Sequence, residues 1–470
     1  MNILTVTILI PFLSAFGLLA INGKRVKNIF KLSLLLSAIC LFLSILMIFL
    51  FDIESSALQF EVKIPWIDYY NVGIHIAVDH LALTAIVFTS LIFFLCFLYL
   101  KDRITKPKET FFWLFILESL FLAFFSCFDF LLSFILWFVT LVAVYFIMAL
   151  EENGGNKTFI NRYFVFNFCA SLIAFIGIII FYLQSVSVTV ASGNFPRTIS
   201  LIAFILIFIG FASRLPLFPL HLWIRNTYSK ISLSMQIILA CVMPIASFYA
   251  IFRFLKGDSF QTFHPVLIVF SLISMIYGAF MAISEKEIKT SLAYLLMFTS
   301  GFCFLGLTVL NLGAFSGFVI GIFTYGSAFA ALFFIADILK CDYKITSFQD
   351  EKHFSQLNPI LAGFLLVGFF AIMGFPLSGG FIAVFSILIG FFSLHPVGTA
   401  FAFLAILLVS LFVLKLMHNF ILKGLTAKEF IPLGARRIVI LSVLATIILV
   451  MGIYPQVFID FIYPSVKILF

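Results

Sequence analysis

Long apolar runs alternate with short polar loops along the whole chain, and these runs predict its helices. They lie at 2–21, 28–50, 77–100, 111–128, 129–150, 162–184, 198–225, 231–255, 265–283, 289–310, 314–339, 359–393, 398–421 and 436–458. Each run is close to or longer than the roughly 20 residues with which a helix crosses about 30 Å of hydrocarbon. The pattern therefore predicts an all-α polytopic membrane protein with about fourteen transmembrane helices.

Two of these runs are unusually long and are interrupted. Pro216 and Pro219 interrupt the seventh run, and the segment Gly374–Gly380 interrupts the twelfth. Proline removes backbone hydrogen bonds that lipid cannot replace, so such a break needs protein or water around it. A matched pair of broken helices, five helices apart, is typical of an internal repeat with polar sites at the breaks. Two unrelated proline kinks would leave the same pattern.

Composition supports the membrane class and excludes several others. Hydrophobic residues make up 64% of the 470 residues and charged residues only 10%. The first run has no basic leading segment and no small-residue cleavage site, so we expect a retained helix and not a signal peptide. The seven cysteines are scattered, which favours neither disulfides nor an iron–sulfur or zinc site. The sequence contains no phosphate-binding loop, dinucleotide fingerprint or hydrolase motif, so we expect no catalytic site on this chain.

The basic residues orient the predicted helices. Of the 28 lysines and arginines, about twenty fall in loops on one side of the predicted membrane and about five on the other. Cytoplasmic loops carry the excess of positive charge, so the side with twenty is predicted to be cytoplasmic. Both termini are then predicted to lie on the non-cytoplasmic side. The charges flank membrane segments, which argues against a nucleic-acid partner and for the lipid bilayer.

Five ionisable residues within or at the ends of the runs are candidates for a proton path: Glu118, Arg214, His221, Lys289 and Lys415. Charged side chains inside a membrane are costly and are typical of functional sites. Each candidate also has a structural alternative. Glu118 and Arg214 can form ion pairs between helices, for instance with one another, and His221 can bond a helix end. Lys289 can be a solvated loop residue, and Lys415 can extend toward the membrane surface.

Five segments carry a resemblance to a known family: 60–81, 214–223, 287–294, 374–381 and 452–455. They resemble motifs of the antiporter-like membrane subunits of respiratory complex I, most of all the M-type (chain 4) group of NADH-quinone oxidoreductase. The resemblance covers nearly the whole chain. It implies fourteen helices with two inverted five-helix repeats, helices 4–8 and 9–13, and broken helices 7 and 12. It divides the chain into an N-terminal three-helix region at 1–110, repeats at 111–255 and 256–425, and a C-terminal helix at 426–470.

The chain departs from the family pattern at the positions that move protons. Where the family has a glutamate on helix 5, a lysine on helix 8, a histidine on helix 11 and a glutamate on helix 12, this chain has Phe138, Ile245, Tyr325 and Val384. The family's lysine on broken helix 7 is Arg214 here. Buried lysine can lose its proton, but arginine stays protonated in proteins. We therefore expect a divergent subunit whose own proton pumping is impaired.

The function implied by this resemblance is that of a non-redox membrane-arm subunit in a proton-translocating NADH-quinone oxidoreductase. NADH, FMN, iron–sulfur clusters and quinone are then expected on partner subunits and not on this chain. A bacterial inner membrane is the expected location. Two alternatives stay open: a subunit of a multi-chain cation/proton antiporter, or a membrane partner in an inorganic-carbon uptake or membrane hydrogenase complex.

Overall fold

The computed structural model describes residues 2–23, 26–67, 72–100, 104, 106–151, 158–184, 200–254, 258–348, 358–422 and 432–467. These residues form two compact units. Unit 1 contains Met1–Arg214, Ile245–His264 and Phe461–Leu469, and unit 2 contains Leu215–Pro244 and Pro265–Asp460. The division into four regions, at 1–110, 111–255, 256–425 and 426–470, was based on a predicted internal repeat and not on contacts in space. It stays a prediction.

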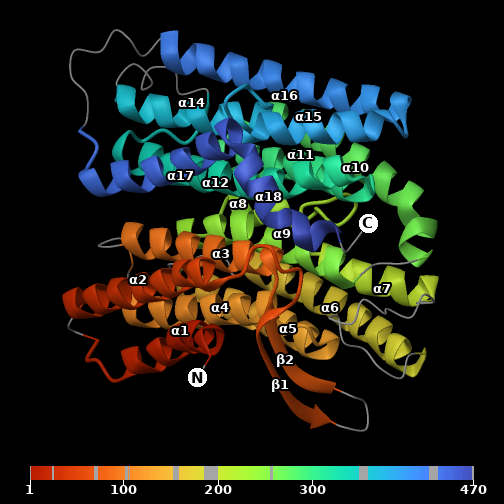
Figure 1. Cartoon of the computed structure of the whole chain (residues 1–470). Helices are drawn as coiled ribbons and strands as arrows, with labels where there is room; N and C mark the ends of the chain where they lie inside the picture. Colours follow the sequence, from red (N-terminus) through yellow and green to blue (C-terminus); the bar gives the residue numbers. More distant parts are fainter. Residues whose placement is uncertain are drawn as a thin grey trace. The chain divides into compact units, whose positions relative to one another are not determined.

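Unit 1 consists of helices and one hairpin (Figure 1). Its elements are α1 (Ile3–Leu19), α2 (Val26–Leu50), β1 (Gln59–Ile67), β2 (Val72–Val78), α3 (His80–Tyr99), α4 (Pro107–Ser126), α5 (Phe130–Glu151), α6 (Thr158–Gln184) and α7 (Leu201–Ala212). Helices α1 to α4 pack side by side, and α6 packs along α7. Gly210 of α7 makes this second contact close, because a Cβ there would collide with the side chain of Ala174.

The hairpin β1–β2 occupies a segment that the sequence identified only as a loop. Its strands are antiparallel, with Val62 opposite Ile76 and Ile64 opposite Ile74. Alternating apolar and polar residues in a half-exposed position favour this strand pairing. The hairpin is joined to the helices by a hydrogen bond of 2.8 Å from the Phe128 N–H to the His75 carbonyl oxygen.

Unit 2 is built around one long helix. Its elements are α8 (Ile224–Tyr228), α11 (Ile288–Thr308), α12 (Leu312–Asp342), α14 (Pro359–Met373), α15 (Gly379–Phe392), α16 (Pro396–Leu422) and α17 (Ala435–Ile453). Helix α12 packs against α11, α14, α15 and α17. Asparagine caps begin α12 and α14, where the Asn311 and Asn358 side chains accept backbone N–H bonds.

Three helices contribute to both units: α9 (Leu233–Phe254), α10 (Asp258–Ser284) and α18 (Pro455–Lys467). The division falls at a proline in two of them, Pro244 in α9 and Pro265 in α10. A proline inside a helix removes one backbone hydrogen bond and weakens the ladder there.

Every predicted apolar run contains a helix of the described structure. Eleven described helices are long and apolar enough to cross a membrane, and four shorter apolar helices accompany them: α1, α7, α14 and α15. The last predicted run is divided, because α17 ends at Ile453 and Pro455 begins α18. The count of fourteen crossings and the inverted repeat stay predictions.

Candidate functional site

The first broken helix interrupts the chain between α7 and α8. Ser213 caps α7, and its hydroxyl donates to the Gly210 carbonyl oxygen at 2.8 Å and to Asn167 Oδ1 at 3.2 Å. Residues 213–223 then form turns that contain Pro216 and a cis bond between Phe218 and Pro219. The predicted break therefore exists, and it begins before the first proline.

Arg214 lies fully buried at this break. Its Nη1 donates to Thr140 Oγ1 at 2.5 Å, and its guanidinium carbon lies 4.1 Å from the centre of the Trp137 ring. Both partners belong to α5. Nε and Nη2 have no hydrogen-bond partner among the described residues. A stack on tryptophan stabilises a desolvated cation by about 2 kcal/mol, which offsets only part of the cost of burying it.

Glu118 on α4 is also fully buried. Within the described part of the chain, neither carboxylate oxygen makes a well-formed hydrogen bond, and the thiol of Cys40 lies beside them. Cys40 Sγ in turn lies 3.9 Å from Ser90 Oγ. The possible ion pair between Glu118 and Arg214 is therefore not formed. Three helices, α2, α3 and α4, bring this acid, thiol and hydroxyl together.

His221 belongs to the same break but to unit 2. Its ring lies 4.8 Å from Tyr277 and 5.7 Å from Phe218, measured between ring centres. The imidazole is buried, and its Nδ1 has no partner among the described residues. The Phe218 N–H donates to Ser274 Oγ at 2.9 Å, which holds the turn against α10. Among the described residues, Nδ1 of His221 therefore makes no hydrogen bond to a helix end.

The second broken helix uses backbone conformation and small residues. Gly374 ends α14 with a left-handed φ of 71°, and its N–H bonds the Ala371 carbonyl oxygen. A Cβ at Gly374 would lie 2.7 Å from Cγ2 of Val384, so that valine covers the break. A Cβ at Gly380, in the first turn of α15, would collide with the Ala371 carbonyl oxygen. This break is apolar at Val384.

The other three positions at which the sequence predicted a departure from the family pattern carry apolar or aromatic side chains as well. Ile245 on α9 and Tyr325 on α12 are buried. Phe138 on α5 packs against the rings of Phe134 and Phe168. None of these four side chains, Val384 included, supplies a carboxylate or an amine to its surroundings.

A second buried arginine, Arg253 on α9, was not among the residues singled out from the sequence. Its Nη2 lies 2.6 Å from Oδ2 of Asp79, which also caps α3 by accepting the Ala82 N–H. Its guanidinium carbon lies 4.1 Å from the centre of the Phe128 ring and 4.7 Å from that of Tyr249. Asp79 lies in the family-like segment 60–81, and this position was the sequence signal that could have pointed to the ion pair. Unlike Arg214, this cation has a carboxylate partner.

Titratable residues gather beside the hairpin, outside the membrane-crossing helices. Asp129 accepts N–H bonds from Gly73 at 3.2 Å and Leu132 at 2.9 Å, and burial raises the pKa of its carboxyl. His75 Nε2 lies 2.8 Å from Glu61 Oε1, and burial lowers the pKa of this histidine. The hydrogen bond from Lys63 lowers the pKa of Glu61.

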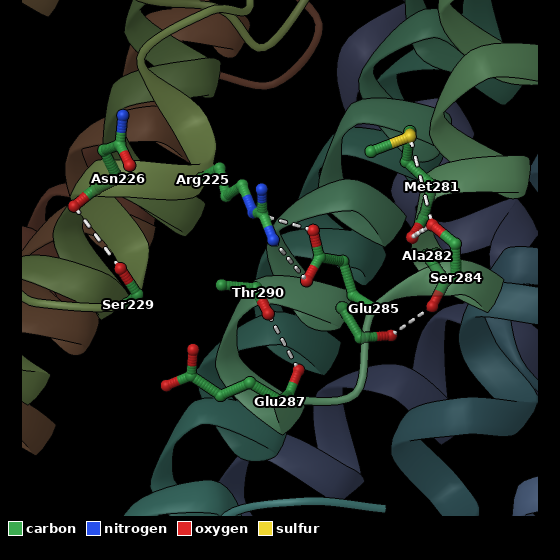
Figure 2. A network of polar contacts seen from close by, with 10 residues as sticks. Arg225, Asn226, Ser229, Met281, Ala282, Ser284, Glu285, Glu287 and Thr290 are labelled. Atoms are coloured by element: carbon green, nitrogen blue, oxygen red, sulfur yellow. Dashed lines mark hydrogen bonds and ion pairs between the residues drawn. The ribbon is translucent and has the colours of Figure 1, made fainter.

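Polar contacts also surround the start of α11 (Figure 2). Arg225 Nε lies 2.9 Å from Glu285 Oε1, and the Thr290 hydroxyl donates to the Glu287 carbonyl oxygen at 3.0 Å. Burial raises the pKa of Glu287. Lys289 is half-buried in the first turn of α11, with charged groups of Glu287 and α12 around it. It is therefore less exposed than a solvated loop lysine.

Lys415 is exposed on α16 and lines a groove in unit 2. The five predicted candidates thus occupy several separate surroundings. Glu118 and Arg214 are buried in unit 1, while His221, Lys289 and Lys415 belong to unit 2. The structure does not join the two buried charges into a pair.

The sequence was compared with known families and proteins. The profile described as NADH:quinone oxidoreductase/Mrp antiporter, TM, matches residues 127–410. NADH-quinone oxidoreductase subunit M of Rickettsia prowazekii (strain Madrid E) is 26% identical over 482 residues, which cover 99% of this chain and 98% of the relative.

Solved structures share the fold. A chain of respiratory complex I from Thermus thermophilus with bound NADH has a TM-score of 0.86 at 20% identity, and each chain is covered completely. A chain of the Mrp complex from Dietzia sp. DQ12-45-1b has a TM-score of 0.86 at 17% identity, covering 100% of this chain and 97% of that one. The match and the eleven apolar helices make this an integral membrane protein. The chain belongs to the NADH:quinone oxidoreductase/Mrp antiporter transmembrane family.

Proposed function

We propose that this chain is a membrane-arm subunit of a proton-translocating NADH-quinone oxidoreductase and that its own proton route is impaired. The names of its curated relatives, which it matches over nearly its full length, support the role in that complex. NADH, FMN, iron–sulfur clusters and quinone are assigned by this proposal to partner subunits. The proposed location is a bacterial inner membrane, with both termini on the non-cytoplasmic side.

The main support for an impaired proton route comes from the side chains that surround Arg214. The arginine donates to Thr140 and stacks on Trp137, and no carboxylate lies within ion-pair distance among the residues described. A proton relay at this point needs a group that gains and loses its proton, and a guanidinium does not lose one in proteins. Arg214 therefore acts as a fixed positive charge that holds the broken helix.

Glu118 is a second buried ionisable residue of unit 1 that could exchange a proton. It has no cationic partner among the described residues, so taking up a proton would not break an ion pair. We assign it a local role in proton binding and not a through-route. The apolar side chains at Ile245 and Val384 do not continue a path beyond it.

The test is proton stoichiometry in reconstituted complex. Arg214→Met and Glu118→Gln complexes that assemble are expected to translocate as many protons per NADH oxidised as the wild type. Assembly is checked by copurification of the soluble subunits, and NADH oxidation is measured in the same vesicles. A lower stoichiometry in an assembled Arg214→Met complex would refute the impaired route.

A second function is favoured by one observation, a TM-score of 0.86 to a chain of the Mrp complex, the same value as for the chain of respiratory complex I. In that case the chain is a subunit of a multi-chain cation/proton antiporter. Purification of the native complex separates the candidates. Soluble NADH-oxidising subunits support the first function, their absence together with a salt-sensitive deletion strain supports the second, and other soluble enzymes indicate a carbon-uptake or hydrogenase complex.

A further inference from the structure

A groove of about 480 Å³ lies in unit 2 beside α16. Its walls come from the C-terminal end of α10 and the loop after it, from Phe348, and from the C-terminal half of α16. Of its lining residues, Lys415 alone is one of the proton-path candidates. We call it the α16 groove.

One wall of the α16 groove is apolar and partly exposed. It is formed by Leu408, Leu411 and Phe412 of α16, with Ile283 of α10 at the edge. Leu411 is 66% exposed and Ile283 is 43% exposed. Helix α16 is a candidate membrane span of which only a third is buried within the chain. This surface is therefore suited to hydrocarbon and not to water.

The rim of the groove is positively charged. Lys286 and Lys415 are both exposed there. Glu285 lines the same rim, but its carboxylate is engaged by Arg225 at 2.9 Å, as Figure 2 shows. Among the described residues of the rim, no carboxylate neutralises the positive charges of these two lysines.

The loop that carries Lys286 is fixed in place. The Phe348 N–H and the Ser347 hydroxyl both donate to the Lys286 carbonyl oxygen, at 3.1 and 3.0 Å. The Ile288 N–H donates to the Thr346 carbonyl oxygen at 3.0 Å. Phe348 also packs edge-on against Phe412 of α16. These contacts make the groove a preformed site.

We propose that the α16 groove binds an anionic phospholipid. An acyl chain would lie along Leu408, Leu411 and Phe412, and the phosphate would be held by Lys286 and Lys415. A lysine at the end of a membrane helix lays its alkyl stem on apolar surface and directs its ammonium group to the headgroup level. Basic sites between helices at the cytoplasmic face recognise anionic headgroups in this way. The proposal does not depend on the proton route.

The test uses the complete purified complex in vesicles that contain a photoactivatable phospholipid with its reactive group on the acyl chain. Phosphatidylglycerol is compared with phosphatidylcholine, and labelled peptides are mapped by mass spectrometry. Phosphatidylglycerol is expected to label the α16 segment around Leu411 roughly tenfold more than phosphatidylcholine. High salt is expected to remove most of this preference in the wild type and to leave phosphatidylcholine labelling unchanged.

Matched variants separate charge from shape. Lys286→Ala/Lys415→Ala is expected to reduce phosphatidylglycerol labelling to the phosphatidylcholine level. Leu408→Trp keeps both lysines and is expected to reduce labelling by either lipid. Lys31→Ala, an exposed lysine on the membrane helix α2, is the control and should change nothing.

Three results would overturn the proposal. Equal labelling by the two lipids would mean that the groove makes only general lipid contact. The absence of labelling in the wild type would mean that protein covers it. Displacement of the phospholipid by millimolar inorganic phosphate would identify a phosphate site instead of a lipid site.

Discussion

The breaks after α7 and after α14 interrupt two apolar helices of the same chain by different means. At the first break, Arg214 is buried with two of its nitrogens unpartnered among the described residues. At the second, Gly374 adopts a left-handed conformation and Val384 covers it. The first break keeps a charge in the interior, and the second keeps none.

This difference shows that a break in a membrane helix does not by itself make a polar site. The backbone groups that a break releases can be satisfied by capping bonds, as the Gly374 and Phe375 N–H groups do with α14 carbonyls. The close approach of Gly380 to the Ala371 carbonyl oxygen then packs the two halves of the broken helix together. Where a charged side chain is added, as at Arg214, specific partners on another helix are needed as well. The predictions below test each side of this comparison.

The largest effect is expected at the second break, from Gly380→Ala. The added Cβ would collide with the Ala371 carbonyl oxygen, which belongs to backbone and cannot move aside. We expect a loss of about 3 kcal/mol or more in the free energy of unfolding, or failure to fold. The measurement is the thermal midpoint in detergent. Gly363→Ala on α14, where a Cβ meets nothing within 4 Å, is the control and should be nearly neutral. Equal stability of the two variants would show that the second break is not closely packed.

A smaller effect is expected from Val384→Glu, which places at the second break the acid that the resemblance predicts there. The carboxyl would replace an apolar side chain that covers Gly374, so it is expected to cost about 2 to 3 kcal/mol. Stability is measured as before, with Val384→Ile as the control for volume. If Val384→Glu instead raises proton stoichiometry without loss of stability, the second break is a dormant proton site and the comparison fails.

At the first break, Thr140→Val removes the hydroxyl that accepts from Arg214 Nη1 while keeping the shape of the side chain. Hydrogen bonds to charged groups contribute about 1.5 to 3 kcal/mol, and we expect a loss near the lower end because the Trp137 stack remains. Thr446→Val on α17 is the control. Its exposed hydroxyl donates to the Ser442 carbonyl oxygen of its own helix, and its loss should change stability by less than about 0.5 kcal/mol. Similar values for both would indicate that Arg214 does not depend on Thr140.

The smallest expected effect is on the pH dependence of stability. It separates Arg214 from a titrating group, because arginine keeps its charge over the pH range in which histidine titrates. Burial lowers the folded-state pKa of His75, so the unfolded chain binds more protons as pH falls through about 6.5. Stability should therefore decrease from pH 7 toward pH 5. His75→Gln is expected to flatten that slope, and Arg214→Met is expected to lower stability with the slope unchanged. A slope that changes with Arg214→Met would contradict a fixed role for this charge.

Much of the fold could be predicted because membrane helices are defined by local hydrophobicity. The runs at 231–255 and 289–310 correspond to α9 and α11 within a few residues. The hairpin β1–β2 was not predicted, since its short strands carry no comparable signal. The boundary between α17 and α18 was missed although Pro455 marks it, because the apolar run continues through that residue.

The sequence by itself determined that Arg214 would lie inside the protein, because a charge in an apolar run has nowhere else to go at tolerable cost. It also determined that both helices would break near these prolines and glycines, since both residue types restrict or release the local backbone. Only the tertiary structure decided that Arg214 binds Thr140 and Trp137 instead of Glu118, and that Arg253 pairs with Asp79. These partners are far apart in the sequence, and a local pattern of residues does not predict which faces of the helices pack against one another.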